Sequence, residues 1–159
     1  MIWALVVALA AVGSVGWLVR NRRRAVRLGR ARDVAEELLP EIRALMESAD
    51  PKSPSDGEPA RARHYEVCHQ RLPQVLSREL YFAVETFFQC VESYRDARVM
   101  MIEAFDEDDE RSLGDRIRAK DRRDRCLQDV YYTGHGAVEK LERLLAGKPR
   151  DLASVAISY

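Results

Sequence analysis

Residues 2–19 read IWALVVALAAVGSVGWLV and carry no charged side chain. As an α-helix, a segment of this length spans roughly 27 Å, close to the hydrocarbon thickness of a lipid bilayer. A helix in the core of a soluble protein usually keeps a polar face, and this segment has none. We therefore predict that residues 1–20 form an uncleaved transmembrane anchor.

The next segment, residues 20–32, is strongly basic and reads RNRRRAVRLGRAR. Arginines beside a membrane span stay on the cytoplasmic side, where anionic lipid headgroups hold them. This orientation puts the N-terminus outside and the remainder of the chain in the cytoplasm. The residues expected to contact lipid headgroups are Arg20, Arg22, Arg23, Arg24 and Arg27.

Three other interpretations of this region are weaker. A cleaved signal peptide has its positive charge before the apolar run, and Trp17-Leu18-Val19 is a poor cleavage site. A buried hairpin would leave the arginines without a place in the core. Nucleic acid fits the arginines less well than lipid because no aromatic residues are interleaved with them for base stacking.

The composition predicts an all-α fold. The length of 159 residues, with 26 basic and 26 acidic side chains, allows one domain. Eight Gly, six Pro and two Thr argue against a sandwich or barrel, which needs many turns and β-branched strands. The three cysteines, Cys68, Cys90 and Cys126, are too scattered for a disulfide scaffold and are expected to be free thiols in the cytoplasm.

Apolar residues at spacings of three and four predict a small antiparallel helical bundle that continues from the anchor. Residues 21–49 form the basic juxtamembrane segment and the first cytosolic helix, with a kink expected at Pro40. Residues 50–59 are a linker, 60–147 the bundle, and 148–159 a tail. Within the bundle we expect a helix over 60–71 that Leu72-Pro73 ends, a central helix from the N-cap Ser77 to residue 105, and a last helix capped by Ser112. The apolar stripe of this last helix is interrupted at Gly134-His135-Gly136.

Arg63 and His69 are the one pair with a possible catalytic interpretation. Arg63-x5-His69 resembles the Arg-x4-6-His element of HEPN ribonucleases, which are all-helical. The resemblance implies that the two side chains stabilise and protonate groups at a scissile phosphate, across a dimer. In a chain with 22 arginines, about one such match arises by chance. The leading interpretation is therefore an exposed polar helix without catalytic residues, and the anchored ribonuclease is the alternative.

Metal and cofactor sites are not predicted. His64 and Cys68 lie four residues apart and could share a helix face, but a structural zinc site needs four ligands and no second close pair or CxxC is present. The acidic residues 106–110 lack the ligand alternation and central glycine of an EF-hand loop.

A looser resemblance covers residues 1–20 and 61–105. Tyr65, Leu72-Pro73, Ser77-Arg78-Glu79-Leu80, Val84 and Phe87-Phe88 form a pattern similar to that of uncharacterised small bacterial inner-membrane proteins, which have one N-terminal span and a cytosolic helical region. The resemblance implies a bacterial inner-membrane location and no particular activity.

These observations predict a membrane-anchored scaffold or signalling module that binds another protein. The expected partner-binding residues are Arg118, Arg122 and Arg125, because exposed charges set orientation and specificity in recognition. Small residues in the anchor, Ala10, Gly13, Ser14 and Gly16, leave homo-oligomerisation open.

Overall fold

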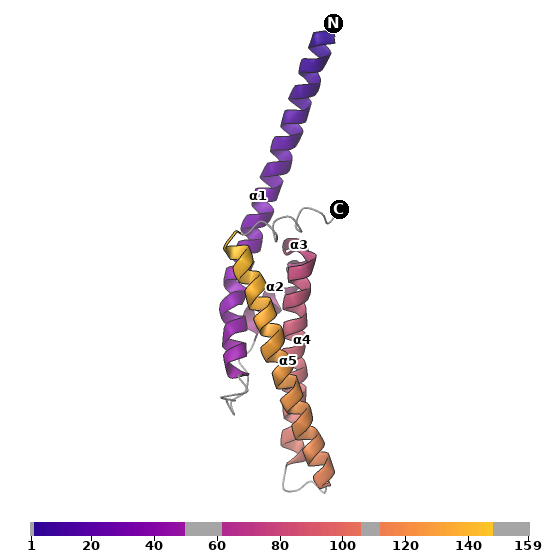
Figure 1. Ribbon diagram of the computed structural model, residues 1–159, viewed down its shortest axis with the longest axis vertical. Helices are drawn as coiled ribbons and strands as arrows, with labels where there is room; N and C mark the ends of the chain where they lie inside the picture. The colour runs from indigo at the N-terminus through magenta and orange to yellow at the C-terminus, as the bar shows by residue number, and fades with distance from the viewer. Residues whose placement is uncertain (1, 50–61, 106–111, 148–159) are drawn as a thin grey trace.

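The structure is a computed structural model that describes residues 2–49, 62–105 and 112–147, with side chains from residue 17 onward. This part of the chain contains helices and no β-strand, which confirms the all-α prediction. The elements in chain order are α1 (Ile2–Ser48), α2 (Arg63–Cys68), the 3-10 helix η1 (His69–Arg71), α3 (Leu72–Val75), α4 (Arg78–Ala104) and α5 (Leu113–Leu145) (Figure 1).

Helix α1 runs unbroken from the apolar segment through the arginines into the bundle, as the sequence indicates. Pro40 lies inside it and does not end it. The N-terminal part extends past the other helices as a single rod (Figure 1). Among the described residues, no helix has a stretch long and apolar enough to span a membrane. The anchor predicted at residues 1–20 falls largely on residues 1–16, whose side chains are outside the described part.

The core lies between the C-terminal half of α1, the N-terminal half of α4 and the C-terminal half of α5. Helix α5 runs between α1 and α4 (Figure 1), so the central position expected for α4 belongs to α5. Apolar residues at spacings of three and four form a stripe along α1 that points into this core. Its fully or nearly fully buried members are Ala31, Ala35, Leu38, Ile42, Leu45 and Ala49. These contacts confirm the helical bundle.

Both predicted N-caps of the long helices are present. Ser77 has an extended backbone, and its Oγ accepts the backbone N–H of Leu80 at 3.3 Å. Ser112 accepts the N–H of Asp115 at 3.3 Å in the same way. Each hydroxyl satisfies one amide that the first turn of a helix leaves without an internal partner.

The segment expected as one helix over 60–71 is divided in the structure. Helix α2 ends at Cys68 and η1 at Arg71, and Pro73 lies in the first turn of α3, where its missing N–H removes no helical hydrogen bond. Gly134 and Gly136 do not interrupt α5. Gly134 is buried, and a Cβ at its position would lie 2.6 Å from Met46 Sδ and 2.9 Å from Phe87 Cε2. The glycine therefore allows α1, α4 and α5 to approach one another closely.

Helices α4 and α5 form an antiparallel hairpin that continues past the end of α1 (Figure 1). We call this part, residues 95–105 and 113–126, the arm. Its only fully buried residues are Ala97 and Ala104. The apolar spacing along α4 predicts that Ile102 and Phe105 join the core, but this prediction is wrong: both are exposed, because no described helix covers the arm.

Candidate functional site

The basic segment of α1 forms the first candidate surface. Arg20, Arg22, Arg23, Arg24 and Arg27, the predicted lipid-contacting residues, are all exposed. Burial begins only at Leu28 and Ala31, where α1 enters the bundle. The arginines therefore lie between the apolar N-terminal segment and the bundle, on a part of the helix with high positive charge density.

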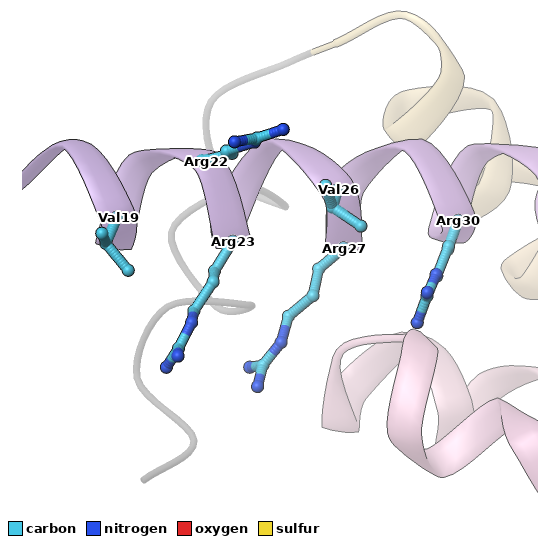
Figure 2. A pocket seen from close by; sticks show the side chains of 6 residues that line it. All are labelled: Val19, Arg22, Arg23, Val26, Arg27 and Arg30. Carbon is cyan, nitrogen blue, oxygen red and sulfur yellow. The ribbon is translucent and has the colours of Figure 1, made fainter.

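A shallow hollow of about 590 Å³ lies along this segment and is lined by α1 side chains alone. Arg23, Arg27 and Arg30 extend from the same side of the helix, whereas Arg22 points elsewhere (Figure 2). The spacing of four and three puts their guanidinium groups on one face. Such a row of cations suits several separate phosphate groups. Arg30 was not among the predicted contact residues, although its heptad spacing from Arg23 could have indicated it.

The Arg63 and His69 pair lies at the two ends of the short α2–η1 segment. Both side chains are exposed, and His69 Nδ1 lies 2.9 Å from the carbonyl oxygen of Glu66. Arg63 and His69 are six residues apart, a separation that rotates one side chain by roughly 240° about the helix axis relative to the other. The two side chains therefore point in different directions and do not share the one face that a joint catalytic role requires.

The surroundings of this pair are acidic. The carboxylate of Glu41 accepts the backbone N–H groups of His64 and Tyr65, each at 3.0 Å, and caps the start of α2 from α1. Glu37 and Glu41 also raise the pKa of the Cys68 thiol, after the larger effect of burial. Carboxylates beside the motif repel an RNA backbone, so the geometry does not favour a ribonuclease site.

The neighbouring aromatic contact holds α2 onto α4. The ring of Tyr65 stacks on Phe88 with centroids 3.8 Å apart, and its hydroxyl donates a 2.8 Å hydrogen bond to Glu85 Oε2. Burial, and then the Glu85 carboxylate, raise the pKa of Tyr65 well above its ordinary value. The phenol therefore stays protonated and acts as a structural hydrogen-bond donor.

Neither Cys68 nor Cys126 is activated as a nucleophile. Burial raises the pKa of Cys68 and of Cys126, so both stay protonated at neutral pH and are poor nucleophiles. Within the described residues, no group of three or more histidine, cysteine or acidic side chains could hold a metal ion. The acidic residues 106–110 lie outside the described part.

The second candidate surface is on α5 in the arm. The predicted partner-binding residues Arg118, Arg122 and Arg125 are exposed and follow the spacing of four and three. Arg118 Nη2 lies 2.6 Å from Asp115 Oδ1. The Ser112 hydroxyl, which donates to Asp115 Oδ2 at 2.7 Å, and then Arg118 lower the pKa of Asp115 to about 2. Asp115 is therefore ionised at neutral pH and offsets the charge of Arg118, whereas Arg122 and Arg125 add two further positive charges to the same face.

A third surface was missed in the sequence. The arm exposes large apolar side chains from both helices: Val99, Met100, Ile102 and Phe105 on α4, and Leu113 and Ile117 on α5. Phe105 also has the guanidinium carbon of Arg116 5.9 Å from its ring centroid. The apolar residues are visible in the sequence, but their exposure depends on where α1 ends relative to the hairpin. That relation appears only in the folded chain.

Comparisons with family models, with curated proteins and with solved structures find no match for this chain.

Proposed function

We propose that this chain is a membrane-anchored helical scaffold that presents the arm to a protein partner at the cytoplasmic face of a bacterial inner membrane. The observation that carries the proposal is the form of α1. One helix joins three parts: a charge-free segment at residues 2–19, the exposed arginines between residues 20 and 30, which we call the arginine row, and the apolar residues between 31 and 49 that are buried in the bundle. A helix that extends alone past its bundle with an apolar sequence needs an apolar environment, and a bilayer provides one.

The arginine row supports the same orientation. Its cations lie where the headgroups of the inner leaflet would be if residues 2–19 crossed the bilayer. Each arginine near an anionic surface contributes about 1 kcal/mol of attraction. Arg23, Arg27 and Arg30, which share a face (Figure 2), are the residues best placed to contact several lipid phosphates at once.

The bundle supports a binding role more than a catalytic one. Its polar contacts are structural: Glu41 caps α2, Tyr65 binds Glu85, and Lys140 Nζ pairs with Glu79 at 2.5 Å. The exposed cationic face and the exposed apolar residues are both on the arm, the part of the chain farthest from the N-terminal rod (Figure 1). A surface at that distance is well placed to meet a cytoplasmic protein.

Alkaline carbonate extraction of vesicles tests the anchor. The full-length chain should stay in the pellet, and a Leu9→Arg, Val12→Arg double variant should move to the supernatant, because each arginine at the centre of a span costs about 2.5–3.5 kcal/mol. The matched control adds two arginines at exposed bundle positions, Val67→Arg and Tyr132→Arg, and should stay in the pellet. Extraction of the unmodified chain would refute the anchor.

Charge reversal tests the partner-binding face. Crosslinking in intact membranes should join the chain to a partner protein, and replacing Arg118, Arg122 and Arg125 together by Glu should abolish that product. The three side chains are exposed, so the bundle should remain folded by circular dichroism. An unchanged crosslinked product would remove these arginines from the interface.

A further inference from the structure

One flank of the arm is apolar and uncovered. It consists of Ile102 and Phe105 on α4 and Leu113 and Ile117 on α5, which we call the apolar flank. Their exposed fractions are 53%, 51%, 75% and 52%. The same arm buries only alanines between its helices. A hairpin that is stable alone would bury its large side chains and expose its small ones, so this arrangement indicates a surface that another element covers.

The apolar flank continues the stripe that is buried in the bundle. On α4, Phe105 follows Val84 and Val91 by three and two heptads, and Ile102 follows Phe88 by two. Those three earlier residues are buried. Side chains separated by whole heptads lie on the same face of packed helices. The face of α4 that is buried in the bundle is therefore exposed in the arm.

Helix α5 repeats this relation. Leu113 precedes the buried Leu127 and Leu141 by two and four heptads, and Ile117 precedes Leu145, which packs against the core, by four. On both helices of the hairpin, the face that is buried in the bundle therefore continues past the end of α1. In the arm this face is exposed on both helices, and it is apolar on both.

Two segments of the chain can be excluded as the cover. Residues 148–159 start at the end of α5 far from the arm. Fully extended, they reach about 43 Å, whereas Leu113 is roughly 50 Å away along the helix. Residues 50–61 read DPKSPSDGEPAR and contain no large apolar side chain to pack on the flank.

We propose that the apolar flank binds the apolar flank of a second copy of this chain, so that two arms form a four-helix bundle. Along the hairpin, residues whose numbers add up to about 220 lie opposite each other, as in the pairs Glu79–Lys140 and Phe105–Arg116. A two-fold axis parallel to the arm places α4 of one copy on α5 of the other at unchanged height.

This pairing is self-complementary. Ile102 meets Ile117 of the second copy, and Phe105 meets Leu113. One step closer to the bundle, Arg98 faces Asp124 of the second copy. Apolar residues therefore meet apolar ones, and opposite charges meet at the border. Arg98 also has a partner within its own chain, and its positive charge lies at this border whether or not that contact is kept.

The area fits a dimer that the membrane assists. The four side chains expose roughly 400 Å² per copy, so they contribute about 800 Å² in two copies, and the charged residues at the border must supply the rest of the about 1,000 Å² that a specific interface needs. Parallel arms require both N-termini on the same side, so this arrangement rests on the proposed membrane anchor. Anchoring in one bilayer also raises the effective concentration of the two arms.

Crosslinking between two tagged copies tests the pairing. Each full-length copy has its three native cysteines replaced by Ala, and the two carry different tags. One copy contains Ile102→Cys and the other Ile117→Cys. In membrane vesicles, a short bismaleimide should give a product with both tags, at least about fivefold above a pair that carries Arg122→Cys in both copies. Equal yields at both positions would indicate random collision and overturn the proposal.

A second measurement leaves the native cysteines in place. The full-length chain in detergent should have the mass of a dimer, and an Ile102→Glu, Ile117→Glu variant that of a monomer. An Arg122→Glu, Arg125→Glu control, on the outer face, should remain a dimer. A monomeric unmodified chain overturns the pairing. Carbonate extraction of the same vesicles separates the two proposals, because loss of the dimer with retention in the pellet refutes the pairing alone.

Discussion

Replacement of Gly134 by Ala tests the close contact among the three long helices. Gly134 lies in the middle of α5 and is buried. A methyl group there would overlap with Met46, whose Sδ would lie 2.6 Å away, and with Phe87 Cε2 at 2.9 Å. Phe87 is fully buried and cannot move out, and Met46 is nearly so. Either side chain must leave its packed position.

Two opposing effects set the magnitude. Gly→Ala in a helix interior stabilises the helix by about 0.8–1 kcal/mol. Overpacking a closed core costs about 1–3 kcal/mol. The Gly134→Ala variant should therefore lose about 0–2 kcal/mol of unfolding free energy. The control is Gly136→Ala in the same helix, where a Cβ meets nothing within 4 Å. This variant should gain about 0.5–1 kcal/mol, because only the helix propensity changes.

The difference between the two variants is the measured quantity. Urea unfolding in detergent, followed by circular dichroism, should give Gly136→Ala as the more stable by about 1–3 kcal/mol. A Met46→Ala, Gly134→Ala double variant should lose less than the sum of the two single changes, because the smaller side chain leaves room for the methyl group. If Gly134→Ala stabilises the chain as much as Gly136→Ala, α1 does not pack against α5 at this point.

Three further perturbations test other contacts. Tyr65→Phe keeps the aromatic ring but removes the hydrogen bond to Glu85 and should cost about 0.5–1.5 kcal/mol in urea unfolding; an unchanged midpoint would contradict the bond. Arg63→Ala with His69→Ala should leave the rate of cleavage of a labelled RNA unchanged, and a lower rate in the double variant would revive the ribonuclease alternative. The carboxyl of Asp115 should titrate at about 2 in NMR spectra of the folded chain. Because this pKa is below the unfolded value of about 3.9, the stability that it contributes is present above pH 4 and is lost as the pH falls toward 2. A midpoint near 4 would contradict the Ser112 and Arg118 contacts.

The sequence was sufficient for the local features of the fold. The stripe of α1 and the caps Ser77 and Ser112 follow from spacing and hydroxyl chemistry, which act over three or four residues. The place of Pro73 has a local cause too, since a proline disrupts a helix interior but fits the first turn of α3. Gly134 shows the limit. Helix propensity alone favours a break there, and only contacts with Met46 and Phe87, far away in sequence, explain why a glycine is required.

The candidate surfaces divide in the same way. The exposure of the arginine row on α1 follows from its density of charge and could be anticipated. The apolar flank could not, because Val91 and Phe105 have the same heptad position and differ only in what covers them. Periodicity gives the face of a helix that is apolar, whereas tertiary structure decides where along the helix that face is buried.

The lengths of the helices explain why the chain has uncovered surfaces at both ends. The buried stripe of α1 spans residues 31–49, roughly 28 Å of helix, whereas α5 is roughly 50 Å long. The part of α1 that packs in the bundle is shorter than the hairpin, so about 20 Å of the arm stays bare. Helix α1 also begins well before the bundle, so its own N-terminal part is unpaired with any other helix (Figure 1). The offset between α1 and the hairpin thus produces one free apolar region at each end. A bilayer suits the region that is a single rod, and a second arm suits the region that is a two-helix face.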